Sequence, residues 1–138
     1  FHGLGVERFN LWLLSGFEGG APREQIPRIS EVMQYITEAM DLDLSQRPDF
    51  ISSLHTPPCT IPVGYEACRF SARELDLLIG DAGGHWFWLE ESPIEGGSWL
   101  PGCADCPARP SCSGPRADYL EAHGADEFMP LPDGDRLC

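Results

Sequence analysis

Three cysteines in a short stretch rich in Gly and Pro are the residues of this chain best suited to chemistry. Cys103, Cys106 and Cys112 form a C-x2-C-x5-C run. The first two can place their thiolates on one metal atom or on neighbouring irons of a cluster, and the third follows after a second short loop. Ligation by sulfur alone favours iron–sulfur clusters or structural zinc over hard cations. The run therefore predicts a metal centre, and its spacing leaves the metal open.

Three thiolates need a fourth ligand to close such a centre, and the remaining cysteines are Cys59, Cys68 and Cys138. We expect Cys59, because it follows two prolines at the end of an apolar segment, and a ligand on so stiff a segment has little ordering entropy left to lose. The competing interpretation of Cys59 is a small buried residue without a ligand role. Cys68, on a freer Gly-containing stretch, is the alternative ligand. Cys138, at the terminus, is expected to be exposed and free.

The segments before Cys59 predict a strand, a helix and a second strand. Residues 6–15 are a compact apolar run, typical of a strand buried on both faces. Apolar residues at helical spacing follow Pro27, which fits the first turn of a helix that is expected to end near residues 42–45. Residues 50–54 form the second short strand. A crossover helix between two such strands implies a parallel pair with a right-handed connection.

After Cys59 the sequence predicts a β-hairpin followed by a helix. Apolar segments 75–79 and 85–89 flank a Gly-rich connection, as in a hairpin. A capping-box pattern from Ser71 to Glu74 favours a short helix in competition with the first of these strands. Residues 116–123 are a candidate helix that Gly124 ends. A polar tail follows from Pro130.

Composition narrows the possible partners. The sequence has 22 acidic residues against nine arginines, with a net charge of −13. Nucleic acid is not an expected partner, because phosphate contacts need clustered positive charge. No run of about 18 apolar residues occurs, so no membrane-spanning segment is expected. Six cysteines could form three disulfides in a secreted domain, but the clustering of three of them favours reduced ligands in the cytoplasm.

The cysteine run resembles the auxiliary-cluster extensions, called SPASM and twitch, of radical S-adenosylmethionine enzymes. It matches the first three cysteines of the SPASM pattern C-x2-C-x5-C-x3-C, and Arg116 stands at the position of the fourth. The Thr-Pro-Pro-Cys-Thr-Ile-Pro segment around Cys59 is similar to the turn that leaves the last barrel strand in such enzymes. Residues 119–131 are similar to the segment that follows the run there. The family's C-x3-C-x2-C loop, which binds the catalytic cluster and S-adenosylmethionine, does not occur in these 138 residues.

The resemblance implies an α/β fold of two parts. Residues 1–58 would be the last βαβ unit of a partial (β/α) barrel, residues 59–131 a small α+β auxiliary-cluster domain with a hairpin and a helix, and residues 132–138 a tail. The alternative is a small free-standing α/β domain. His55 would end a barrel strand, at the edge where barrels place their reactive groups. A structural role for His55 is equally open.

The resemblance also implies one auxiliary [4Fe-4S] cluster on Cys59, Cys103, Cys106 and Cys112. This cluster would position substrate or accept an electron during radical modification of a peptide or small molecule. S-adenosylmethionine and a second [4Fe-4S] cluster would come with an N-terminal barrel half, upstream in the same polypeptide or on a separate polypeptide. These residues would then be part of a cytoplasmic enzyme. The alternatives are a non-catalytic zinc or iron–sulfur interaction module and an accessory subunit that delivers substrate to a separate catalytic subunit.

Overall fold

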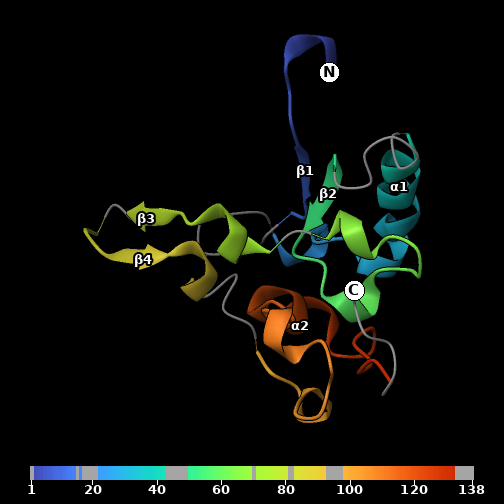
Figure 1. Ribbon diagram of the computed structural model, residues 1–138. Coiled ribbons are helices and arrows are strands. Elements are labelled where there is room, and N and C mark those ends of the chain that lie inside the picture. Colours follow the sequence, from blue (N-terminus) through green and yellow to red (C-terminus); the bar gives the residue numbers. More distant parts are fainter. Residues whose placement is uncertain are drawn as a thin grey trace.

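Two parallel strands and the helix between them form the first half of the chain. The computed structural model in Figure 1 describes residues 2–14, 16, 22–42, 50–69, 71–80, 83–92 and 98–132. Strand β1 (Phe9–Trp12) lies beside β2 (Ile51–Leu54), and α1 (Ile29–Asp41) connects them. The strands are parallel, with Phe9 opposite Ile51 and Trp12 opposite Leu54. The predicted succession of strand, helix and strand with parallel pairing is confirmed.

Helix α1 forms because its apolar residues recur on one face. Ile29, Ile36 and Met40 are buried on that face. The helix begins later than the Pro27 prediction allows, since Arg28 is the N-cap and Pro27 precedes it. The side chain of Glu31 accepts a hydrogen bond from the backbone N–H of Arg28, which satisfies a donor that has no partner within the helix. The prediction that Pro27 lies in the first turn was therefore wrong.

Strand β1 is shorter and more open than the sequence indicates. It spans four residues rather than the predicted segment 6–15, and Phe9 and Trp12 are 40% and 55% exposed. By contrast, Ser52, Ser53 and Leu54 of β2 are buried, because β2 lies between β1 and a parallel bridge from Ser53 to Arg69. The neighbour of β1 among the described strands is β2 alone, so β1 is not buried on both faces here. Burial of both faces was expected only where the missing half of the predicted barrel is present, and it stays a prediction.

The predicted hairpin is present and projects from the body of the molecule (Figure 1). It consists of β3 (Leu78–Gly80) and β4 (Trp86–Trp88), which pair antiparallel. The predicted first strand begins three residues late, because a 3-10 turn occupies Ala72–Leu75. The carboxylate of Glu74 accepts a hydrogen bond from the backbone N–H of Ser71, so this part of the capping box is formed as well. The predicted short helical segment and the predicted first strand of the hairpin therefore both occur, one after the other.

Helix α2 (Ala117–His123) packs against the start of α1. The predicted helix is confirmed, and Gly124 ends it with a φ of 77°. The hydroxyl of Tyr119 accepts a hydrogen bond from the backbone N–H of Ile29 at 2.9 Å, and it donates one to the carboxylate of Glu127. A buried cluster joins the two helices through Ile26, Ile29, Tyr119 and Phe128.

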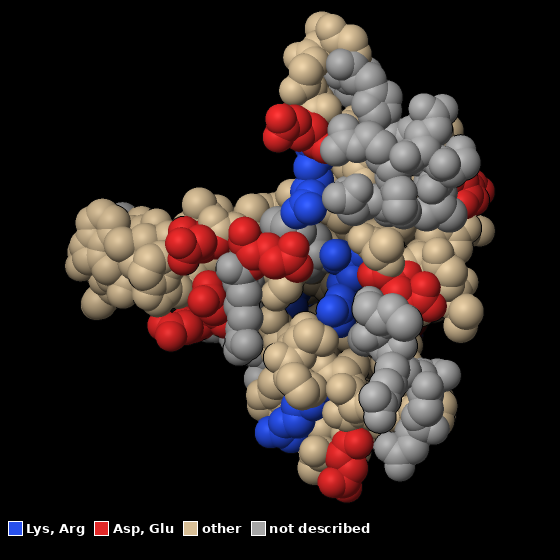
Figure 2. Space-filling model, viewed as in Figure 1, with Lys and Arg blue, Asp and Glu red and all other residues tan. Residues whose placement is uncertain are grey.

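Charged side chains of both signs are distributed over the surface. Figure 2 shows acidic and basic side chains interspersed on one face, with no single acidic patch across it. None of the helices in the described part of the protein has the length and apolar character needed to cross a membrane. Residues 133–138, with Cys138, lie outside the described residues, as do the predictions made for them.

Candidate metal centre

Four cysteines from two distant segments line one small cavity. Cys59 comes from the turn after β2, and Cys103, Cys106 and Cys112 come from the loop that precedes α2. Apart from the thiols, the walls are almost entirely apolar and include Pro57, Pro58, Trp99, Phe128 and Met129. The open space is about 20 Å³, room for about one water molecule. The structure thus brings together all four cysteines that the sequence singled out.

A proline-fixed turn holds Cys59 in place. His55, directly after β2, has a φ of 69° and redirects the backbone toward the prolines. The carbonyl of Pro57 then accepts hydrogen bonds from the backbone N–H and the hydroxyl of Thr60, at 2.8 and 2.7 Å. Pro58 is buried beneath this turn. Cys59 is therefore fixed by the end of the sheet on one side and by a hydrogen-bonded turn on the other.

Successive tight turns position Cys103 and Cys106. The backbone N–H of Cys103 donates to Leu100 O at 2.9 Å, that of Cys106 to Cys103 O at 3.4 Å, and that of Arg109 to Cys106 O at 3.0 Å. The guanidinium of Arg109 lies 4.6 Å from the centre of the Trp99 ring, close enough for a cation–π contact. It also reaches the carbonyl of Cys103 at 3.5 Å. Arg109 and Trp99, which also line the cavity, thus hold this loop in place.

Cys112 accepts a backbone hydrogen bond at its sulfur. The N–H of Gly114 lies 3.2 Å from Cys112 Sγ. Gly114 has a φ of 79°, a conformation that a side chain disfavours, so glycine suits the turn that aims this N–H at the sulfur. Hydrogen bonds to ligand sulfurs are among the features that set the reduction potential of iron–sulfur clusters.

The environment of the cavity raises the pKa values of Cys59 and Cys112 and so favours their protonated thiols. Burial, together with the nearby thiols of Cys112, Cys103 and Cys106, raises the pKa of Cys59 to about 11. Burial also raises the pKa of Cys112, although the Gly114 N–H and the charge of Arg69 oppose that effect. A metal cation that binds here would displace these protons, because thiolates are the ligating form.

Cys68 lies elsewhere, in the apolar core. It is 1% exposed and clusters with Ile36 and Met40 of α1. Cys59 rather than Cys68 therefore shares the cavity with the C-x2-C-x5-C run, and these four cysteines of the cavity are free thiols. Among the described residues, no three or more His, Cys, Asp or Glu side chains are grouped so that they could hold a single metal ion. Ligation by the four cysteines stays a prediction.

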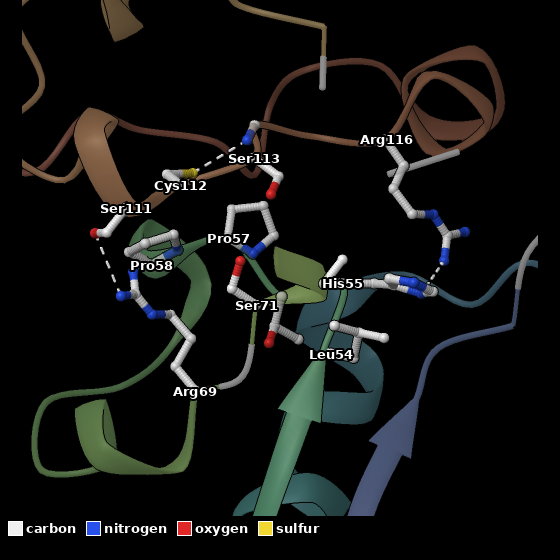
Figure 3. A pocket seen from close by; sticks show the side chains of 13 residues that line it. Leu54, His55, Pro57, Pro58, Arg69, Ser71, Ser111, Cys112, Ser113 and Arg116 are labelled. Carbon is white, nitrogen blue, oxygen red and sulfur yellow. Dashed lines mark hydrogen bonds between the residues drawn. The ribbon is translucent and has the colours of Figure 1, made fainter. Parts of the chain in front are cut away.

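Arg116, at the position of the fourth SPASM cysteine, faces a different part of the molecule. It is 5% exposed, and its Nε and Nη2 donate to the carboxylate of Asp118 at 2.9 and 2.7 Å. Its Nη1 and Nη2 also donate to the carbonyls of Leu13 and Leu14 at 3.2 and 2.9 Å. Arg116 lines a second pocket beside the cysteine cavity (Figure 3). The sequence pattern did not predict this role of Arg116.

His55 contacts Arg116 at the carboxyl end of β2, the position predicted for it. Arg116 Nη1 lies 2.9 Å from His55 Nδ1. A guanidinium can only donate, so Nδ1 accepts, and the neutral ring carries its proton on Nε2. Burial and then the charge of Arg116 lower the pKa of His55 to about 4. His55 is therefore neutral at pH 7, and the structure shows it in a structural contact.

In comparisons with known proteins, no family model, no curated protein and no solved structure matches this chain.

Proposed function

We propose that this protein binds a [4Fe-4S] cluster through Cys59, Cys103, Cys106 and Cys112, as the auxiliary-cluster part of a radical S-adenosylmethionine enzyme. One observation carries the proposal. A cysteine in the turn after β2 and three cysteines from the loop before α2 line the same cavity. Cysteines that are distant in sequence and share an apolar-walled cavity form a donor set that fits sulfur-seeking metals.

The surroundings of the four thiols favour such a centre. The apolar walls restrict water, and the Gly114 N–H is already directed at the sulfur of Cys112. These are two of the features by which proteins adjust cluster potentials. When bound, the cluster would supply an electron acceptor or a site for substrate. The protein's own residues would fix the thiolates in place and limit the access of water.

The first half of the sequence supports the enzymatic part of the proposal. A parallel β1–α1–β2 unit is the repeating element of a (β/α) barrel. Among the described strands β1 has a neighbour on one edge only, so a further strand of a barrel could pair with its other edge. The helices of that barrel half could cover the exposed side chains of Phe9 and Trp12. Cys59 lies in the turn after β2, so the cysteine cavity would lie at the carboxyl-end face of that barrel.

The test is a metal and sulfide analysis of the protein purified without oxygen. We expect a brown protein with roughly four irons and four sulfides per molecule. Cys68→Ser is the matched control, because it removes a thiol that lies outside the cavity, and it should keep the iron. Stoichiometric zinc without sulfide would contradict the cluster. A C-x3-C-x2-C loop upstream of this segment, or on a co-purifying polypeptide, would support the radical enzyme over an accessory role.

A structural zinc module is the second candidate, because four cysteine thiolates are also a common ligand set of structural zinc. Zinc would need the four thiols to converge within about 2.3 Å of one atom. Zinc bound at one equivalent, with loss on Cys59→Ser and on Cys106→Ser, would establish this alternative.

A further inference from the structure

We propose that the pocket beside the cysteine cavity binds a carboxylate group through the guanidinium of Arg69. The pocket lies at the carboxyl end of β2, and Arg69, Ser71, Ser111, Ser113 and Arg116 are among its lining residues (Figure 3). It shares Cys112 with the cysteine cavity as a wall residue. A ligand here would therefore lie next to the proposed centre, but its binding does not depend on a metal.

Arg69 has a buried hydrogen-bond donor that a ligand could satisfy. Its Nη1 is buried and has no hydrogen-bond partner among the described residues, while its Nη2 donates to Ser111 Oγ at 3.3 Å. No carboxylate in the described part of the protein forms an ion pair with it, although the whole sequence has 22 acidic residues. A buried donor of a charged group without a partner costs free energy, and a bound anion would remove that cost.

The other cationic group of the pocket is already engaged. The guanidinium of Arg116 contacts Asp118, two backbone carbonyls and His55, and its ion pair with Asp118 is almost fully buried. In Figure 3 the guanidiniums of Arg69 and Arg116 lie at opposite ends of the pocket. The available positive charge is therefore that of Arg69, and the ligand's charged group belongs at its end.

The size and walls of the pocket favour a carboxylate. The open space is about 30 Å³, which holds about two water-sized groups and so matches two carboxylate oxygens. A guanidinium presents two parallel N–H donors that fit a planar carboxylate. The hydroxyl of Ser113 can donate a further hydrogen bond, whereas that of Ser111 already donates to the carbonyl of Ala108. Pro57, Pro58 and Ala72 can pack against a short apolar stem. A tetrahedral phosphate is bulkier than a carboxylate, and only the guanidinium of Arg69 would be available to balance its higher charge.

Acetate is the probe, with acetamide as its neutral isostere and inorganic phosphate as a second anion. The readouts are the guanidinium ¹⁵N–¹H signals of Arg69 by NMR and the thermal midpoint of the full-length protein. We expect acetate to shift these signals and raise the midpoint, acetamide to do neither, and phosphate to bind more weakly. Arg69→Gln should weaken acetate binding at least tenfold. Arg23→Gln is the control, since it removes the same charge at an exposed ion pair with Glu121.

A free carboxylate and one carried by a peptide are then distinguished with acetyl-alanyl-alanine and acetyl-aspartyl-amide. If acetyl-alanyl-alanine binds more tightly than acetate, the ligand is the terminal carboxylate of a peptide. If acetyl-aspartyl-amide binds more tightly than acetate, the ligand is an acidic side chain. Acetate binding that Arg69→Gln leaves unchanged would overturn the proposal, as would equal binding of acetate and acetamide. If Arg69→Gln lost both its iron and its acetate binding, Arg69 would belong to the metal centre, and the proposal of a separate carboxylate site would be overturned. Because iron is counted separately, absence of iron with intact acetate binding would refute only the proposed function.

Discussion

Arg116 Nη1 lies 2.9 Å from Nδ1 of His55, a contact that joins the start of α2 to the end of β2 across 61 residues of sequence. The same guanidinium holds the carbonyls of Leu13 and Leu14, which follow β1. The ends of both parallel strands and the first turn of α2 thus meet at one side chain. Cys59 follows His55 closely and Cys112 precedes Arg116 closely, so this contact fixes the two segments that supply the cysteine cavity.

The first prediction concerns the pH dependence of stability through His55. Its pKa is about 4 in the folded protein and about 6.5 in an unfolded one, so between these values the unfolded state binds a proton that the folded state excludes. The stabilising effect of the neutral ring is complete above pH 6.5 and is lost as the pH falls toward 4. The full shift corresponds to at most about 3 kcal/mol.

The measurement is urea unfolding at pH 7 and pH 4.5 of the wild type, His55→Gln and His85→Gln. His55→Gln should reduce the loss of stability between the two pH values, because glutamine does not titrate. Substitution of the exposed hairpin residue His85 should leave that loss unchanged. An identical pH dependence in the wild type and His55→Gln would show that His55 does not titrate as described.

The second prediction concerns the ion pair of Arg116 with Asp118. Arg116→Met should destabilise the fold by about 3–5 kcal/mol, because it leaves a buried carboxylate and two backbone carbonyls without their donor. Arg23→Met removes an ion pair whose two side chains are each 56% exposed, and it should cost about 0–1 kcal/mol. Urea unfolding of both variants compares these costs, and similar values for the two would contradict the central role of Arg116.

Local sequence patterns predicted the elements better than their limits and their burial. The apolar spacing of α1 and the glycine that ends α2, Gly124, are local features. They could therefore be recognised without knowing what the helices pack against. Leu75 was assigned to a strand, but it ends a 3-10 turn, because a short apolar run suits either element until its neighbours are known. The exposure of Phe9 and Trp12 in β1 has a related cause. Burial depends on what covers a strand, and its own sequence does not contain that information.

The sequence predicted the cysteines of the site, but it did not predict the roles of the neighbouring Arg69 and Arg116. Cys103, Cys106 and Cys112 carry their own spacing signal, and the prolines before Cys59 indicated a rigid segment. Nothing local indicated that Arg69 would be left with a buried free donor, since that depends on how Ser111 and the cysteine loop pack against it. For Arg116 the only local signal was Asp118, two residues later at the start of a helix.

The third prediction concerns the uncovered side of β1. Trp12, which ends β1, and Leu14, two residues later, are 55% and 47% exposed, so the isolated protein should associate as its concentration rises. Trp12→Gln should weaken this association more than Trp86→Gln does, although Trp86 on the hairpin is the more exposed of the two at 70%. Sedimentation velocity at several concentrations measures the difference. A monomeric wild type at all of them would count against the missing barrel half.

The fourth prediction is that Cys106→Ala removes the metal and loosens the loop before α2. Residues 98–115 are held by single turns and bury little apolar surface of their own, with Ala108 and Pro115 as buried apolar side chains. Ligation would then supply much of their order. Metal analysis and limited proteolysis should show loss of metal and new cleavage within this loop, with β1, α1 and β2 still protected. Unchanged metal content and an unchanged thermal transition would exclude Cys106 as a ligand.

The last prediction separates Cys59 from Cys68 by two substitutions of the same kind. Cys59→Ser removes a thiol from the cavity, so iron should be lost. Cys68→Ser places a hydroxyl in the core beside Ile36 and Met40, so it should lower stability by about 1–3 kcal/mol while iron stays bound. Iron content and the thermal midpoint are measured for each variant. Iron content should therefore fall in Cys59→Ser, and the thermal midpoint should fall in Cys68→Ser while its iron is kept. Loss of iron in Cys68→Ser with retention in Cys59→Ser would reverse the assignment of the fourth ligand.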